Sequence, residues 1–233
     1  METKNSIKFL FNAQYAPLTD TMSFIKTPID DAIKAYEQWT ANQVKPITKR
    51  KTEFSGNFEQ LLLKSLPFTY PWRDVFFEAK NGWTGHYTNL NTITYAANNV
   101  ARLLNVTMIY IAAWASKYKR IVNGWGGGVF SFYNGENLIR HMMLSDQDGW
   151  DFDNYGEPFP FEDVEKYKEK FARNRFTPEM LDKYLKEFGI DFFNEDFYMP
   201  YGSKAYIMEH VRPPFENEVP MSLRDMRKRC MYE

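Results

Sequence analysis

Alternating hydrophobic and polar positions, interrupted by turn residues, predict β-hairpins in the middle of the chain. Asn-Gly pairs with β-branched and aromatic neighbours begin at Asn81, Asn123 and Asn134. This dipeptide is the strongest short-range hairpin signal, because both of its residues tolerate positive φ. Asp148-Gly149 provides a fourth turn. Together these signals predict an antiparallel meander over residues 74–153.

Apolar residues at helical spacing predict three helices in the first half of the chain. Thr27-Pro28, followed by two aspartates, marks the start of the first helix. Residues 57–66 and 94–104 form the other two. The apolar run 108–115 is predicted to be a fully buried strand.

The last third of the chain carries a second helical region. Three apolar residues at helical spacing predict one helix within residues 160–172. A second helix is predicted to begin with Thr177 as its N-cap and to end before Gly189. A strand is predicted over residues 204–211, and the basic tail after it is expected to be mobile.

The predicted fold class is α+β, an antiparallel meander sheet flanked by helices with a C-terminal helical pair. The segment IKFLFNA is expected to join the sheet, and no Pro/Gly/Ser-rich linker follows it, so we predict a single domain over residues 1–233. Its parts are an N-terminal strand and helices (1–69), the antiparallel sheet region (70–158), a helical region (159–200), and a strand with the basic tail (201–233).

Composition and charge limit the functional classes. The 233 residues are 44% hydrophobic and 18% aromatic, which supports a large buried core and excludes disorder as the main state. The net charge of −1 gives no basic footprint, so a nucleic-acid partner is not expected. A single cysteine, Cys230, cannot form an intrachain disulfide and indicates a reducing compartment. The longest apolar run is too short for a membrane helix, so we expect a cytoplasmic protein. No cofactor is expected.

The glycine-rich stretch NGWGGGVFSF, residues 123–132, has the composition of a phosphate-binding loop. Such a loop needs Lys-Ser/Thr at the start of a helix, whereas these glycines lead into a predicted strand. The stretch is better explained by a bulged hairpin, or by a place where another backbone approaches closely.

An acidic segment, Ser145 to Glu165, holds eight carboxylates and no Lys or Arg. Its glycine is misplaced for an EF-hand calcium loop, which leaves three interpretations: a solvated turn, a metal site of another kind, or a surface that binds a basic partner. The predicted partner-binding residues are the four aspartates of its first half and two aromatic anchors: Asp146, Asp148, Asp151, Asp153, Trp125 and Tyr155.

A catalytic alternative uses acid–base side chains of the predicted strands. Glu78 and His86 lie on partner strands of one hairpin, and Arg140 and His141 lie near the end of the meander. None of the histidines has a second His or Cys at ligand spacing, so no metal site is predicted.

The stretches GGGVFSFYNGENLIRHMM, GWDFDNYGEPFPFE, EKY and NRFTPEMLDKYLKEFGIDFFNEDFY resemble a pattern of uncharacterised bacterial proteins. The resemblance covers about residues 70–198 and includes the upstream element WTGHYTN. The matching positions are Arg140, Trp150, Phe152, Gly156, Pro158, Phe161, Glu162, Tyr167, Arg175, Phe176, Thr177, Leu181, Tyr184, Gly189, Ile190, Phe197 and Tyr198. Such proteins are similar to the immunity proteins of bacterial polymorphic or contact-delivered toxin systems. The resemblance implies no catalytic residues.

The sequence therefore supports three hypotheses. The first is a non-enzymatic, immunity-like inhibitor that binds a basic toxin or effector through the acidic segment. The second is a small-molecule hydrolase or transferase with a site near Glu78, His86, Arg140 and His141. The third is a self-assembling protein that uses an exposed sheet edge.

Overall fold

The structure is a computed structural model that describes residues 9–43, 48–90, 95–116, 124–216 and 218–232. Its main feature is one nine-stranded sheet among these residues, with the strand order β2-β9-β3-β4-β1-β5-β6-β7-β8. All neighbouring strands are antiparallel. The strands are β1 (Thr21–Ile25), β2 (Lys49–Ser55), β3 (Arg73–Ala79), β4 (Trp83–Thr88), β5 (Thr107–Ala115), β6 (Trp125–Asn134), β7 (Asn137–Ser145), β8 (Asp151–Tyr155) and β9 (Lys204–His210).

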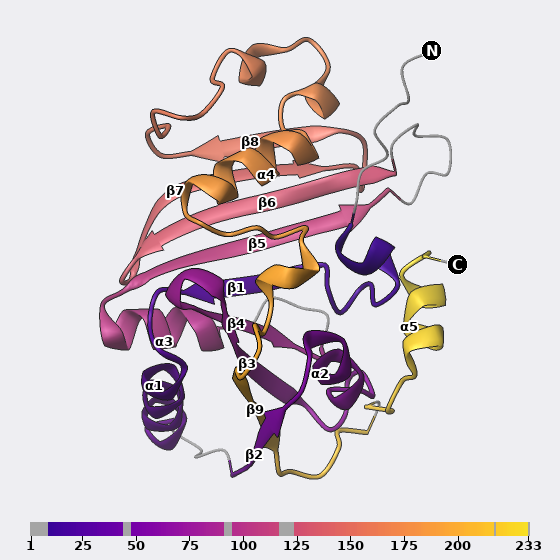
Figure 1. The fold of residues 1–233 in the computed structure, drawn as a ribbon. Helices are drawn as coiled ribbons and strands as arrows, with labels where there is room; N and C mark the ends of the chain where they lie inside the picture. Colours follow the sequence, from indigo (N-terminus) through magenta and orange to yellow (C-terminus); the bar gives the residue numbers. More distant parts are fainter. Residues whose placement is uncertain (1–8, 44–47, 91–94, 117–123, 217, 233) are drawn as a thin grey trace.

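Helices lie on both faces of the sheet (Figure 1). The α-helices are α1 (Ile29–Ala41), α2 (Phe58–Lys64), α3 (Ala96–Leu104), α4 (Pro178–Glu187) and α5 (Leu223–Arg229). We call the face that carries α1 and α3 the α1 face, and the opposite face, which carries α2 and α4, the α4 face. Each face has its own hydrophobic core.

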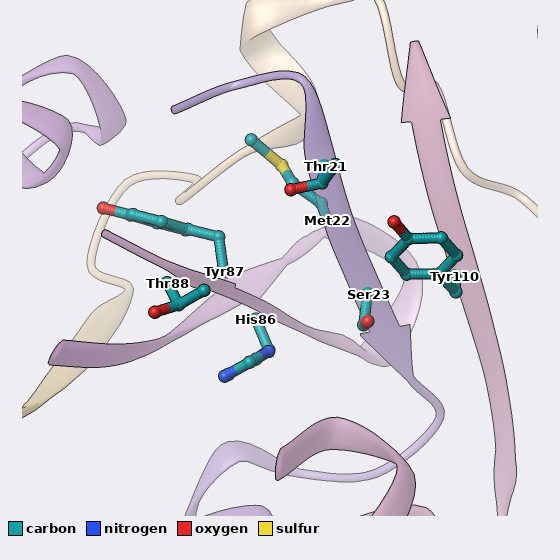
Figure 2. A pocket seen from close by; sticks show the side chains of 7 residues that line it. All are labelled: Thr21, Met22, Ser23, His86, Tyr87, Thr88 and Tyr110. Carbon is teal, nitrogen blue, oxygen red and sulfur yellow. The ribbon is translucent and has the colours of Figure 1, made fainter. Parts of the chain in front are cut away.

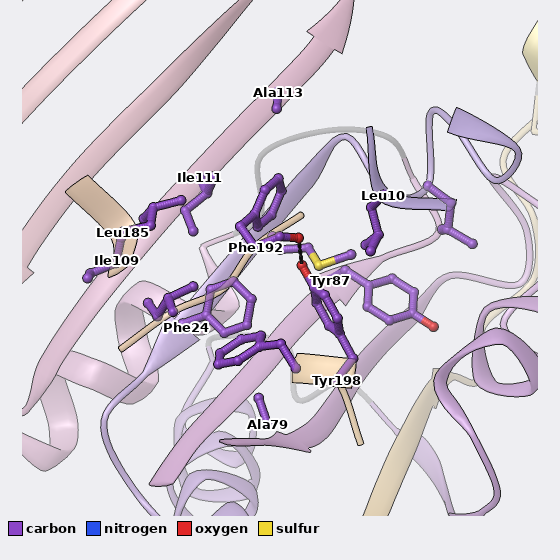
Figure 3. Packing of buried hydrophobic residues seen from close by; sticks show 14 of the residues in the cluster. Leu10, Phe24, Ala79, Tyr87, Ile109, Ile111, Ala113, Leu185, Phe192 and Tyr198 are labelled. Carbon is purple, nitrogen blue, oxygen red and sulfur yellow. Dashed lines mark hydrogen bonds between the residues drawn. The ribbon is translucent and has the colours of Figure 1, made fainter. Parts of the chain in front are cut away.

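The larger core lies on the α4 face and is rich in aromatic rings (Figure 3). The rings of Phe24 and Phe197 pack with centroids 5.5 Å apart, and Tyr198 donates a 2.6 Å hydrogen bond to the carbonyl oxygen of Phe192. Burial of the hydroxyl raises the pKa of Tyr198 well above its ordinary value, so it stays a neutral donor. The chain that follows α4 is thereby fixed against the sheet.

The predicted hairpins are present, but the meander is interrupted. Asn81 and Gly82 have φ of 60° and 70° between β3 and β4, and Gly135 has φ of 59° between β6 and β7. Asp148-Gly149 connects β7 to β8 as predicted, whereas the pair at Asn123 lies outside the described residues. Between β4 and β5 the sheet receives β1, so these two strands are not neighbours.

The predicted helix within residues 160–172 is wrong. The segment contains two short 3-10 turns, Lys166–Lys168 and Ala172–Asn174, and the side chains of Val164 and Phe171 are 38% and 55% exposed. Of the three residues at helical spacing, Val164, Tyr167 and Phe171, only Tyr167 packs against the core. No apolar face therefore stabilises a helix here. The C-terminal helical pair is therefore reduced to α4.

Other predicted elements agree in part with the structure. α4 follows Thr177, whose hydroxyl accepts a hydrogen bond from the Met180 N–H at 3.4 Å. The described part of IKFLFNA is a 3-10 turn, Leu10–Ala13, and not the predicted strand. The basic tail contains α5, which buries Met226 in the core.

Residues 125–132 of the glycine-rich stretch lie inside strand β6, where neighbouring backbones approach closely. A Cβ atom at Gly127, which has φ of 146°, would lie 2.1 Å from the carbonyl oxygen of Leu144. The interpretation as a close approach is thus confirmed. The part of the chain that the structure describes contains no helix with the length and apolar character needed to span a bilayer.

Candidate functional site

Part of the acidic segment, Asp151–Tyr155, forms the edge strand β8. Cross-strand partners share a face, and the row Ser23, Tyr110, Ser131, His141 and Tyr155 runs along the α1 face from β1 to β8. By alternation, Asp151 and Asp153 lie on the same face as Tyr155. All three are exposed, and Tyr155 is 61% exposed.

The α1 face of β6, β7 and β8, which we call the open face, has no covering helix among the described residues. α1 and α3 contact β1, β3, β4 and β5 instead (Figure 1). The half-buried side chains of His141 and Met143 lie on the open face beside the acids of β8, whereas Tyr133, at the other end of β6, packs against the core beneath α1 and α3. The open face therefore joins apolar and aromatic surface to an acidic border.

His141 contributes little positive charge to this border. Its Nδ1 atom lies 2.8 Å from the hydroxyl oxygen of the buried Ser131. Partial burial lowers the pKa of His141 and outweighs the nearby Asp153, which favours the charged form. The imidazole is therefore mainly neutral at pH 7, and Asp151 and Asp153 form no ion pair with any described cation.

Two of the predicted partner-binding residues are not on the surface. Asp146 is 2% exposed and accepts a 2.7 Å hydrogen bond from the Ser116 hydroxyl. Trp125, predicted as an exposed anchor, is 4% exposed, and its indole N–H donates to the carbonyl oxygen of Phe176 at 3.3 Å. Both predictions are corrected: strand β6 turns Trp125 into the core on the α4 face. Asp148, Asp151, Asp153 and Tyr155 remain accessible.

Arg140 lies on the α4 face, opposite His141, and is fully buried. Its guanidinium forms an ion pair with Glu162, with Nη2 and Oε2 2.8 Å apart, and donates to the carbonyl oxygens of Tyr155 and Gly156. The Tyr167 hydroxyl donates to the same Glu162 carboxylate at 2.6 Å. Burial and this carboxylate raise the pKa of Tyr167. The cluster fixes the chain after β8 to the sheet and is closed to a substrate.

The other two residues of the catalytic alternative also have separate partners. The Glu78 carboxylate accepts a 2.9 Å hydrogen bond from the backbone N–H of Lys204. His86 instead pairs with Asp74, with Nε2 and Oδ1 3.0 Å apart. The structure therefore does not bring Glu78, His86, Arg140 and His141 into one site.

A polar cluster that the sequence did not reveal lies beneath α1. Asp74 on β3 is buried, and both of its carboxylate oxygens accept hydrogen bonds. Oδ1 accepts from His86 Nε2. Oδ2 accepts from His210 Nε2 at 3.0 Å and from the Tyr36 hydroxyl at 2.6 Å. Burial alone would raise the pKa of the Asp74 carboxyl, but the hydrogen bonds from His210 and His86 outweigh it and lower that pKa. Because a carboxylate only accepts, each Nε2 carries its hydrogen.

Two further side chains surround this cluster. Lys49, the cross-strand partner of His210, has its Nζ atom 4.5 Å from the centre of the Tyr36 ring. The Trp72 ring stacks on His210 with centroids 4.0 Å apart, and its buried indole N–H has no hydrogen-bond partner among the described residues. In the sequence, this site is indicated only by the alternation of Trp72, just before β3, with Asp74 on β3. Residues from α1, β2, β4 and β9 meet it only in the folded sheet.

A small pocket adjoins the cluster at His86 (Figure 2). The pairing of β1 with β4 ends at Ser23 and His86, and the pocket lies where the strands separate. It holds about 200 Å³, part of it open to solvent, and is lined by Thr21, Met22, Ser23, His86, Tyr87, Thr88 and Tyr110. Because part of this space is open to solvent, the pocket suits a water molecule or a group of a few atoms. No set of three or more His, Cys, Asp or Glu side chains in the described ranges could hold a metal ion.

Comparison of the chain with protein-family models, curated proteins and solved structures finds no match.

Proposed function

We propose that this chain is a non-enzymatic protein-binding protein, an immunity-like inhibitor whose open face binds a basic toxin or effector. The observation that carries the proposal is that Asp151 and Asp153, which form no ion pair with a described cation, lie beside the exposed ring of Tyr155 and the half-buried side chains of His141 and Met143. Asp148 extends the same charge into the turn before β8.

This combination has the composition of a protein interface. A typical interface has an apolar or aromatic centre with a polar rim, and tyrosine is enriched among the residues that contribute most to binding. Tyr155 offers a large exposed ring without the rotamer entropy of a long aliphatic chain. Carboxylates at the rim attract a basic partner and increase its association rate. The open face therefore suits a partner with a basic active-site surface.

The decisive experiment changes the three exposed aspartates together. The partner is first captured from native-host lysate at low salt. Asp148→Asn, Asp151→Asn and Asp153→Asn are then expected to reduce its association rate constant about tenfold at low ionic strength, because rim charges act mainly on encounter. The dissociation rate is expected to change little. Surface plasmon resonance at several salt concentrations measures both.

A matched control neutralises three exposed acids outside the acidic segment: Asp196→Asn, Glu179→Gln and Glu187→Gln. This variant has the same net charge as the β8 variant but keeps the acidic edge, so its association rate is expected to stay close to that of the wild type. Equal rates for all three proteins would rule out the acidic edge as the binding surface.

A second candidate function is a small-molecule enzyme, which one observation favours. His86, backed by the Asp74 carboxylate, lines the pocket together with the hydroxyl groups of Ser23 and Thr88. An imidazole held by a carboxylate is a common general base. A fragment screen by thermal shift tests this candidate: a true ligand raises the Tm of the wild type and not that of His86→Gln. If no fragment raises the Tm, the enzyme candidate fails.

A further inference from the structure

The two edges of the sheet carry opposite charge. The strand order ends with β2 on one side and β8 on the other. β2 begins Lys49-Arg50-Lys51, and most of its residues are exposed. β8 carries Asp151 and Asp153. A basic edge strand and an acidic edge strand therefore lie at opposite ends of one continuous sheet.

The charges on the two edges share the same face and spacing. Lys49 pairs with His210 and Lys51 with Met208, both of which lie on the α1 face. Asp151 and Asp153 also lie on the α1 face, as derived above from the register of β7 with β8. In each strand the charged residues are two positions apart. If β2 and β8 were neighbouring strands, the two lysines would lie opposite the two aspartates.

The partners of these charges within the chain are weak. Lys51 forms an ion pair with Glu37 at 2.7 Å, but both side chains are about half exposed, at 45% and 46%. The Lys49 amine has the Tyr36 ring as its contact and no carboxylate within ion-pair distance among the described residues. Burial lowers the pKa of Lys49 to about 8, although Asp74 and Glu37 favour its charged form. The edges thus keep charge available for an external partner.

Charged side chains on edge strands normally prevent sheets from joining. Here that protection is incomplete. Two β8 edges repel each other, as do two β2 edges, whereas β8 and β2 attract. We propose that the β8 edge of one copy of this chain pairs with the β2 edge of a second copy, with Asp151 and Asp153 facing Lys49 and Lys51.

The strand order fixes the direction of this pairing. Eight antiparallel pairings separate β2 from β8, so the two edge strands run in the same direction within one chain. A second copy whose α1 face continues that of the first therefore pairs in parallel, with Lys49 beside Asp151 and Lys51 beside Asp153. The contact joins different surfaces, so it produces rows of copies and not a closed dimer. Because β8 has only five residues, the buried area is small and the association is weak and reversible.

The inference does not depend on the proposed function, although both use Asp151 and Asp153. Substitutions on β2 distinguish the two proposals, because the proposed inhibitor surface does not include β2. Substitutions on β2 are expected to change self-association and to leave partner binding as it is. A basic partner on the open face is expected to compete with self-association, since both occupy the acidic edge.

The test is sedimentation velocity of the full chain over a wide concentration range. At low ionic strength the weight-average mass is expected to rise with concentration, and in about 0.5 M NaCl it is expected to remain that of a monomer, because salt screens the edge charges. Lys49→Glu with Lys51→Glu is expected to abolish the rise, as is Asp151→Lys with Asp153→Lys. A wild type that stays monomeric at all concentrations at low salt overturns the proposal.

Exchanging the charges of the β2 and β8 edges gives a stricter test. The chain with all four substitutions restores opposite edges, so it is expected to associate again. Lys64→Glu with Lys80→Glu, two exposed lysines outside β2, gives the same net charge as the β2 variant and is expected to associate like the wild type. Should the four-fold variant stay monomeric while circular dichroism shows it folded, the proposed edge pairing is refuted.

Lys49 borders the buried Asp74 cluster, so its substitution can disturb folding. Arg50→Glu with Lys51→Glu reverses the charge of the same strand and leaves Lys49 in place. This second variant is also expected to be monomeric. Association that survives both the β2 and the β8 reversals would show that another surface is responsible.

Discussion

Replacing Arg140 by methionine is expected to lower the free energy of unfolding by about 3–5 kcal/mol. The substitution leaves the Glu162 carboxylate fully buried without its ion-pair partner. It also removes the donors to the carbonyl oxygens of Tyr155 and Gly156, which connect the end of β8 to the following chain. A buried charge without a partner retains its full desolvation cost, which a methionine side chain of similar volume does not offset.

Urea denaturation monitored by tryptophan fluorescence measures this loss. Arg173→Met, at an exposed arginine of the same region, serves as control and is expected to change stability by less than about 0.5 kcal/mol. The double variant Arg140→Met with Glu162→Met is expected to be more stable than Arg140→Met alone, because it removes the isolated charge. An Arg140→Met protein as stable as the control would mean that the ion pair contributes nothing net.

Replacing Asp74 by asparagine is expected to have the second-largest effect, a loss of about 2–4 kcal/mol. The amide has one acceptor oxygen where the carboxylate has two, so it cannot accept from His86, His210 and Tyr36 together. At least one buried donor is left without a partner. Tyr36→Phe removes the hydroxyl that donates to Asp74 and that also lies 3.1 Å from His210 Nε2, and it is expected to cost about 1 kcal/mol.

The Asp74 variant also has a pH signature. The folded-state pKa of Asp74 lies below its ordinary value of about 3.9. The unfolded chain therefore binds this proton more readily, so the stabilisation by Asp74 is complete above about pH 4 and is lost as pH falls through the folded pKa. Acid denaturation curves of the wild type are expected to fall more steeply below pH 4 than those of Asp74→Asn. Parallel curves for the two proteins would contradict the role of Asp74 as a buried, ionised acceptor.

Local signals predicted several elements correctly. The turns at Asn81, Asn134 and Asp148 depend on the conformational freedom of two or three residues, which the sequence displays directly. α4 was predictable for the same reason, because Thr177 and Gly189 act on backbone groups within one helical turn. Close strand approach at Gly127 followed from its missing side chain.

The errors arose where distant contacts decide the outcome. Residues 160–172 have helical spacing, but the buried Arg140 holds Glu162, and the backbone after it forms bends and two short 3-10 turns. Trp125 sits among glycines, as an exposed anchor would, yet its strand parity turns it into the core. β1 inserts between β4 and β5 by pairing with both, and no local pattern signalled this insertion.

The sequence by itself determined the hairpin turns, the strong helices, the mixed α+β character and the acidity of the segment around β8, because each depends on neighbouring residues or on composition. Only the tertiary structure decided which acids are exposed, which of the two faces each strand residue occupies, and that Asp74 meets His86, His210 and Tyr36. Strand order and register set these relations, and they arise from the burial of side chains that lie far apart in the chain.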